Sequence, residues 1–115
     1  MSPRQRSATG STRQSQAPIF AALGDKTRLA LVGKLSIGPA RSISELAEDS
    51  ALTRQAITKH LRVLERAGIV HGRRSGRESR FKFDPRPIEQ IRAYLEGVSE
   101  HWDQALSRLK SLVEG

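Results

Sequence analysis

Apolar residues recur every three or four positions in several segments, and capping or helix-breaking residues bound each segment. The first such segment has an apolar stripe of Ile19, Phe20 and Leu23, begins at Pro18 and stops at Gly24. Three further segments repeat this spacing before residue 68. We therefore expect helices over residues 18–23, 26–37, 43–49 and 53–67.

Residues that commonly cap helices stand at the expected starts of the second, third and fourth helices. Asp25 and Thr53 stand where an N-cap is needed for the second and fourth helices. Ser42 and Glu45 have the spacing of a capping box, in which each side chain accepts from the other residue's backbone N–H. These residues fix the expected helix starts.

Beyond Gly68 the composition changes to that of strands. Residues 69–71 and 79–83 are rich in β-branched and aromatic residues, and they enclose a loop over residues 72–78 that contains two glycines and three arginines. This segment predicts a β-hairpin with a basic tip.

The last segment, after residues 84–87, predicts a helix that runs to about Val113. Its apolar or small residues are separated by alternating gaps of three and four positions. They are Ile88, Ile91, Leu95, Val98, Trp102, Ala105, Leu109 and Leu112. Because a small domain has too little core to cover this seam, we expect a second subunit to cover it.

The length and composition limit what kind of protein this is. The chain has 115 residues and no cysteine, so it fits one small domain without disulfides or thiolate chemistry. It has no apolar run of the roughly 20 residues that a membrane span needs and no signal-peptide core, which makes a cytoplasmic location the default and gives no reason to expect a membrane partner. We expect residues 1–17 to form a disordered basic tail and residues 18–115 to form the domain.

The positive charge is concentrated in one part of the chain. The net charge is +8, and residues 53–82 contain nine basic residues against two acidic ones. A local excess of this kind favours a polyanionic partner over general solubility. The tail adds three arginines, either as a basic arm that attracts phosphate or as a leader without a role.

The third and fourth helices and the turn over residues 50–52 make a helix-turn-helix. Removing the apolar stripe from the fourth helix leaves a polar and basic outer face that can enter a major groove, where Arg and Gln read bases and Thr and Lys hold phosphates. Predicted contacts on this helix are Thr53, Arg54, Gln55, Thr58, Lys59 and Arg62. The hairpin adds Arg73, Arg74, Arg77, Arg80 and Lys82, which are suited to the DNA backbone or minor groove.

The whole pattern predicts a mainly α protein with a small hairpin, in the order α-α-α-α-β-β-α, which is a winged helix-turn-helix. Residues 23–29, 43–47, 53–64 and 67–70 together resemble the ArsR/SmtB family of bacterial repressors. The resemblance covers residues 18 to 112 and implies a homodimer on a palindromic operator in double-stranded DNA. It also places wing contacts on Arg73, Arg74, Arg77 and Arg80, and implies dimerisation through the first and last helices. The expected dimer residues are Ile19, Phe20, Leu23, Ile91, Leu95, Val98, Trp102, Leu106 and Leu109.

The sequence departs from that family's metal sensors. Their third helix commonly carries a cysteine pair, which is absent here, and the last helix has only Glu100, His101 and Asp103 as candidate ligands. His101 and Asp103 are two positions apart and face different sides of a helix, so we expect no metal site and no cofactor. A metal-responsive repressor with a His/carboxylate site shared between subunits stays open as an alternative.

The two remaining histidines and two other classes of function complete the picture. We expect His60 to be half-buried, either packed or facing phosphate, and find no partner for His71 at the start of the hairpin. A winged-helix module that binds an acidic protein is a second alternative. The chain has no phosphate-binding loop and no nucleophile, base and acid set, so we do not expect an enzyme. The sequence names no small-molecule effector.

Overall fold

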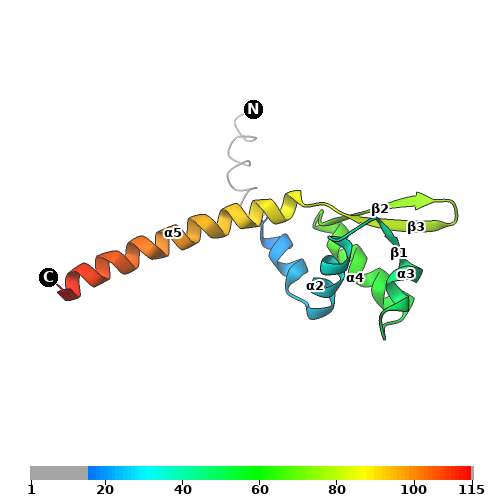
Figure 1. The fold of residues 1–115 in the computed structure, drawn as a ribbon, viewed down its shortest axis with the longest axis horizontal. Coiled ribbons are helices and arrows are strands. Elements are labelled where there is room, and N and C mark those ends of the chain that lie inside the picture. The colour runs from blue at the N-terminus through cyan, green and yellow to red at the C-terminus, as the bar shows by residue number, and fades with distance from the viewer. Residues whose placement is uncertain (1–15, 115) are drawn as a thin grey trace, which may run out of the picture.

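The computed structural model describes residues 16–114 (Figure 1). Residues 16 and 17 already belong to a helix that runs over residues 16–23, so this helix begins at least two residues before the predicted start at Pro18. Gln16 and Ala17 are both compatible with a helix, so the first apolar residues of the pattern do not mark where this helix begins. The predicted disorder of residues 1–15 lies outside the described residues.

Helix α2 covers Lys26–Leu35, α3 covers Ile43–Glu48 and α4 covers Arg54–Arg66. The predicted caps are confirmed. Asp25 Oδ2 accepts from the backbone N–H of Arg28 at 3.0 Å, and Thr53 Oγ1 accepts from that of Ala56 at 3.1 Å. Ser42 and Glu45 form the complete capping box at the start of α3. Local hydrogen bonds therefore set where these three helices begin.

Packing of α4 against the other elements forms the centre of the core. Six side chains are fully buried, and each stabilises the fold by roughly 1.5–3 kcal/mol relative to an exposed position. They are Leu46, Ile57, Leu61, Leu64, Ile69 and Val70. Three of them lie on α4 at the predicted spacing, so the orientation of its outer face follows from burial of its inner face.

A three-stranded antiparallel sheet packs beside α4. Strand β1 covers Arg41–Ser42, β2 covers Val70–Ser75 and β3 covers Glu78–Phe83, in the order β1-β3-β2. The predicted loop over residues 72–78 is wrong, because the hairpin stays paired up to Ser75 and Glu78 and only residues 76 and 77 form the turn. Gly76 has φ +65°, which suits the tight turn and lets the strands continue further than their composition indicates. The short strand β1 was not predicted.

Helix α5 covers Arg86–Glu114, and its 29 residues span about 43 Å. Its first turns pack against the body through Ile88 and Ile91, and the remainder extends away from it (Figure 1). Side chains along the extended part stay exposed, including Trp102 at 64% and Leu109 at 57%. Within residues 16–114, no helix is both long enough and apolar enough to cross a membrane.

Candidate nucleic-acid interface

The outer face of α4 carries the residues that the sequence predicts. Arg54, Gln55, Lys59 and Arg62 are exposed, and Thr58 is half-buried. They lie opposite the buried stripe of α4, which holds them at fixed positions on one surface. No carboxylate within the described part of the chain lies at ion-pair distance from these basic side chains. Their charges are available to a ligand.

The two threonines of this face have different hydrogen-bonding capacity. Thr58 Oγ1 donates its proton to the carbonyl oxygen of Arg54 at 2.7 Å, so it presents its methyl group and lone pairs outward. Thr53 Oγ1 accepts the N-cap hydrogen bond and keeps its proton. Thr53 can therefore donate to a phosphate oxygen, whereas Thr58 is suited to an apolar contact such as a thymine methyl group.

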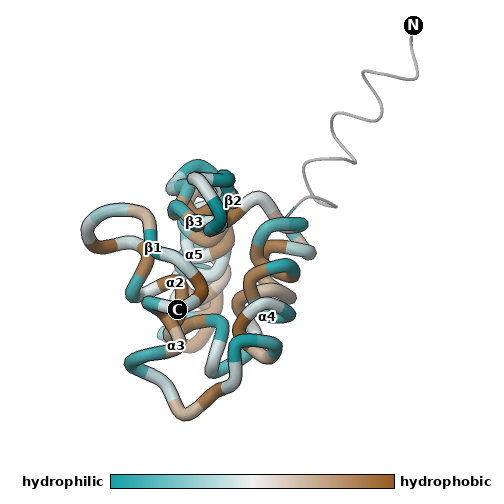
Figure 2. The backbone as a smooth tube through the Cα atoms, turned by 90° about the vertical axis from the view of Figure 1, so that its right-hand side faces the viewer, coloured by the Kyte–Doolittle hydropathy of each residue, from teal (hydrophilic) through white to brown (hydrophobic). Residues whose placement is uncertain are grey.

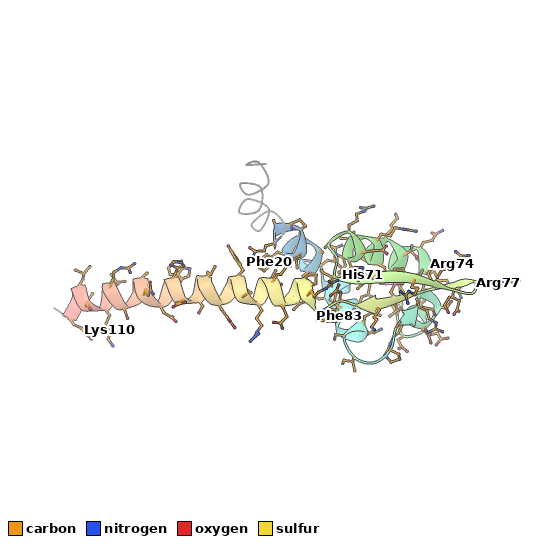
Figure 3. All side chains as sticks on the ribbon, turned by 90° about the horizontal axis from the view of Figure 1, so that it is seen from above. Phe20, His71, Arg74, Arg77, Phe83 and Lys110 are labelled. Atoms are coloured by element: carbon orange, nitrogen blue, oxygen red, sulfur yellow. The ribbon has the colours of Figure 1, made fainter. Side chains whose placement is uncertain are left out.

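The wing, which we define as strands β2 and β3 with their turn, projects beyond the helices. Arg73, Arg74 and Arg77 are exposed, and no carboxylate of residues 16–114 pairs with them. Figure 3 shows Arg74 and Arg77 at the end of the wing farthest from α5, and Figure 2 shows hydrophilic residues along its outer part. This region presents arginine side chains well outside the core.

Arg80, which the sequence also predicts as a wing contact, does not share that freedom. Its guanidinium donates to Glu45 Oε1 at 3.1 Å and to the carbonyl oxygen of Ala40 at 3.4 Å, and it lies 3.6 Å from Glu78 Oε2. Arg80 thus joins β3 to the start of α3. Its charge is largely balanced by carboxylates that the sequence places 35 and 2 residues away.

A groove of about 460 Å³ lies between the helix-turn-helix and the wing. It brings together Arg54 and Thr58 of α4 with Arg77 and Ser79 of the wing. Its remaining lining residues are Ser42, Ile43, Ser44 and Glu78. Two guanidinium groups and several hydroxyls are a chemistry that suits phosphate. The residues of α4 and of the wing that are predicted to contact DNA therefore line the same groove.

The wing is held to α4 by a hydrogen bond that the sequence did not reveal. Glu65 Oε2 accepts from the backbone N–H of Gly72 at 3.1 Å. With Glu78 facing Arg80, both acidic residues of the basic segment are engaged within the fold. The exposed surface between α4 and the wing is consequently more basic than the segment's charge indicates.

A second connection joins β2 to α5 and supplies the partner that His71 lacked. His71 Nε2 lies 2.8 Å from Asp84 Oδ2, and the Asp84 carboxylate also accepts from the Arg86 side chain and backbone. The hydrogen bonds from Arg86, followed by that from His71, hold the pKa of Asp84 well below its usual range. An Asp followed by Pro indicates that a helix starts nearby, but it does not indicate the contact between Asp84 and His71.

His60 is half-buried, as predicted. Its Nδ1 lies 3.5 Å from a guanidinium nitrogen of Arg28 and 3.8 Å from Asp25 Oδ2. Arg28 also donates to the carbonyl oxygen of Ala22 at 2.6 Å, at the end of the first helix. This cluster ties the first helix and α2 to α4. In residues 16–114 no group of three or more His, Asp or Glu side chains is placed to hold a metal ion.

The predicted dimer residues divide by exposure. Ile19 and Ile91 are buried at 3% and 7% in the core of the chain itself, which leaves them little surface for a partner. Leu23 and Val98 are half-buried. Exposed are Phe20, Leu95, Trp102, Leu106 and Leu109. Phe20 also packs edge-on against Tyr94, with ring centroids 6.1 Å apart, so the first helix contacts α5 through these two rings.

Known proteins resemble this chain along most of its length. A family model described as a helix-turn-helix domain matches residues 23–73. The HTH-type transcriptional regulator Rv2034 of Mycobacterium tuberculosis is 34% identical over 104 residues, which cover 90% of this chain and 94% of that protein.

Solved structures of transcriptional regulators also resemble this chain. An ArsR-like transcriptional regulator from Rhodococcus sp. RHA1 is 34% identical, with a TM-score of 0.77 and coverage of 89% of this chain and 95% of that chain. The homodimeric winged helix-turn-helix DNA-binding domain Mb0332 of Mycobacterium bovis is 20% identical, with a TM-score of 0.64 and coverage of 79% and 83%. At that identity the second likeness shows a shared fold.

Proposed function

Because the chain belongs to the ArsR family of winged helix-turn-helix transcriptional regulators, we propose that it is a homodimeric repressor that binds an inverted-repeat operator. The observation that carries the proposal is the groove between α4 and the wing, which is bordered by Arg54 and Arg77. In the cytoplasm, the dimer bound to its operator would cover a promoter and so repress transcription. The curated relative and the Rhodococcus protein are named as transcriptional regulators, which supports this reading over catalysis.

Each part of the surface has a proposed role. The N-terminal half of α4 enters the major groove, where Arg54 and Gln55 read base edges. Lys59, Arg62 and the proton of Thr53 hold phosphates. Arg74 and Arg77 of the wing lie on the backbone or in the minor groove, where the negative potential attracts guanidinium groups.

The proposed dimer follows from the exposed apolar surface of the first helix and α5. Burying Leu95, Trp102 and Leu109 against a second copy would remove large apolar side chains from water. The homodimeric Mb0332 domain supports this arrangement, because it shares the fold. Two α4 helices one helical turn of DNA apart, about 34 Å, would then read two half-sites of a palindrome.

The proposed roles predict two kinds of binding defect. Replacing Arg54 or Gln55 with Ala should cost about 1–3 kcal/mol of discrimination between the operator and random DNA, because base contacts are lost. Replacing Arg74 or Arg77 with Gln should weaken both DNAs alike and lower the salt slope by about 0.9 for each phosphate contact. Fluorescence anisotropy at several salt concentrations, on an operator selected from random duplexes, measures both effects.

Arg108→Gln is the matched control, since Arg108 is exposed on the distal part of α5, far from the wing. It should bind operator like the parent. If all four variants retained the parent's operator affinity, specificity and salt slope, the proposed DNA surface would be wrong.

A further inference from the structure

A pocket of about 310 Å³ lies where the first helix, α2 and the end of α4 meet. Two arginines, Arg28 and Arg66, border it, and no carboxylate of the described residues does. The other lining residues are apolar or small, and they are Pro18, Ala21, Ala22, Val63 and Ala67. None of them is among the predicted dimer residues, so the proposed dimer does not need to cover this pocket.

The guanidinium group of Arg28 is held in a fixed position. Its Nε donates to the carbonyl oxygen of Ala22 at 2.6 Å, and its Nη2 donates to that of Ala21 at 3.3 Å. Its Nη1 lies 3.5 Å from Nδ1 of His60. Since arginine has five N–H donors, these contacts leave two of them for a ligand. A side chain that is already ordered loses little entropy when a ligand binds to it.

Neither arginine has a carboxylate partner among residues 16–114. Asp25 accepts from the backbone N–H of Arg28, but the Arg28 guanidinium is farther from it than an ion pair allows. Arg66 is exposed on the last turn of α4 and likewise forms no ion pair there. A cleft that is lined by charges of one sign and has apolar walls concentrates the electric field. The pocket therefore attracts an anion.

The lining also determines which kind of anion fits. A carboxylate matches the planar fork of an arginine, with which it can form two parallel hydrogen bonds. The apolar and small walls favour a ligand that also carries apolar surface, because its contact with them removes this surface from water. The volume is near the lower end of the range for small-molecule sites, about 300–1,000 Å³. A compact organic acid meets all three requirements.

We infer that this pocket binds a small organic acid, whose carboxylate accepts from Arg28 and Arg66 and whose apolar body packs against Val63. The inference goes beyond the proposed function and does not rest on it, because this binding requires no DNA. The bound acid would contact the first helix, α2 and α4 together, since all three line the pocket.

Benzoate is a suitable probe, because it joins one carboxylate to a compact apolar ring. Two-dimensional NMR of the isotope-labelled full chain should show saturable shifts of the backbone amide signals of Ala21, Val63 and Ala67, with a dissociation constant in the millimolar range or lower. Benzamide has the same shape without the charge, and sulfate has charge without the apolar body. Each should bind at least about tenfold more weakly than benzoate.

Two substitutions test the charge and the space separately. Arg66→Gln should weaken benzoate binding at least about tenfold, because a hydrogen bond between charged groups is lost, and Arg66→Lys should recover part of the loss. Ala21→Leu fills the pocket from an exposed position of the first helix and should weaken binding without removing a charge. Arg108→Gln, on the distal part of α5, is the control and should bind benzoate like the parent.

Shifts that do not saturate, or that map outside the pocket, would overturn the inference. So would a benzoate dissociation constant that Arg66→Gln and Ala21→Leu leave unchanged. Sulfate binding as tight as that of benzoate would assign the pocket to inorganic anions, and equal binding of benzamide would exclude recognition of the carboxylate. Operator binding is measured separately, so a failure of the proposed function would leave each of these results intact.

Discussion

Carboxylates determine which basic side chains of the surface are free to bind phosphate. Arg80 pairs with Glu45 and Glu78, and Asp84 pairs with His71 and Arg86. Arg73, Arg74 and Arg77 have no such partner among the described residues. Identical residue types in one short hairpin therefore have different roles.

A substitution at Gly72 tests how tightly the wing packs against α4. In Gly72→Ala, the new Cβ would meet the Phe81 ring at 2.8 Å and Glu65 at 3.2 Å, so either the ring or the wing has to move. Overpacking of this kind should lower the free energy of unfolding by about 1–3 kcal/mol. Chemical denaturation measures the change.

The control is Gly33→Ala, on an exposed part of α2, where the added Cβ would meet nothing within 4 Å apart from its chain neighbours and the backbone of its own helix. It should raise stability by up to about 1 kcal/mol, because Ala favours the helix. Equal stability of the parent and the Gly72 variant would mean that the wing is not packed tightly against α4.

Residue spacing predicted the local contacts and missed the distant ones. The caps at Asp25, Ser42 and Thr53 were predicted correctly, because a cap joins residues two or three positions apart. The contacts of Arg80 with Glu45 and of His71 with Asp84 join residues 35 and 13 positions apart. They depend on how the sheet sits on the helices, which the spacing of residues does not specify.

At the scale of elements, three contacts attach the wing to the rest of the fold, and none of them involves the turn at its tip. Glu65 of α4 holds β2 at Gly72, Arg80 joins β3 to α3, and His71 with Asp84 connects β2 to the start of α5. The hairpin was predicted, but its strands are longer than their apolar residues indicated. Exposed arginines are compatible with paired strands when their side chains project into solvent.

The connection at Asp84 predicts a pH dependence. Hydrogen bonds from Arg86 and His71 lower the pKa of Asp84 in the folded protein below that in the unfolded chain. The resulting stabilisation is present above the unfolded pKa, about 4, and is lost as the pH falls from there toward the folded pKa. The difference in unfolding free energy between the parent and Asp84→Asn should therefore shrink as the pH is lowered from 7 to 3.

Urea unfolding at several pH values measures this difference. Asp103→Asn, on an exposed part of α5 without an ion pair in the described residues, should follow the parent at every pH. A difference between the parent and the Asp84 variant that stayed constant down to pH 3 would contradict the account of this connection.

At the scale of the whole molecule, α5 has a seam whose first residues, Ile88 and Ile91, pack against the core of the chain, while Trp102 and Leu109 further along it stay exposed. The alternating spacing predicted this helix and its exposed seam well, because it repeats over many turns. It did not predict which seam residues belong to the core of the chain, since that depends on where the body ends along α5.

The seam predicts a dimer that a single charge disrupts. Leu95→Asp would place a carboxylate in the apolar interface, so sedimentation should show a shift from dimer to monomer and operator affinity should fall at least tenfold. Gln104→Asp, about two and a half turns further along and on the opposite face of an ideal helix, adds the same charge outside the seam and should stay dimeric. A parent protein that sediments as a monomer at micromolar concentration would contradict the proposed dimer.

Selection of bound sequences from random duplex DNA tests whether a dimer of this protein reads a palindromic operator through α4. We expect enrichment of a two-fold symmetric site whose half-site centres are about 10 base pairs, or a multiple, apart. In the same selection Gln55→Ala should lose preference at particular bases, while Arg77→Gln should enrich the same site more weakly. Recovery of no common sequence by the parent, or of a site without two-fold symmetry, would contradict a dimer that reads an operator through α4.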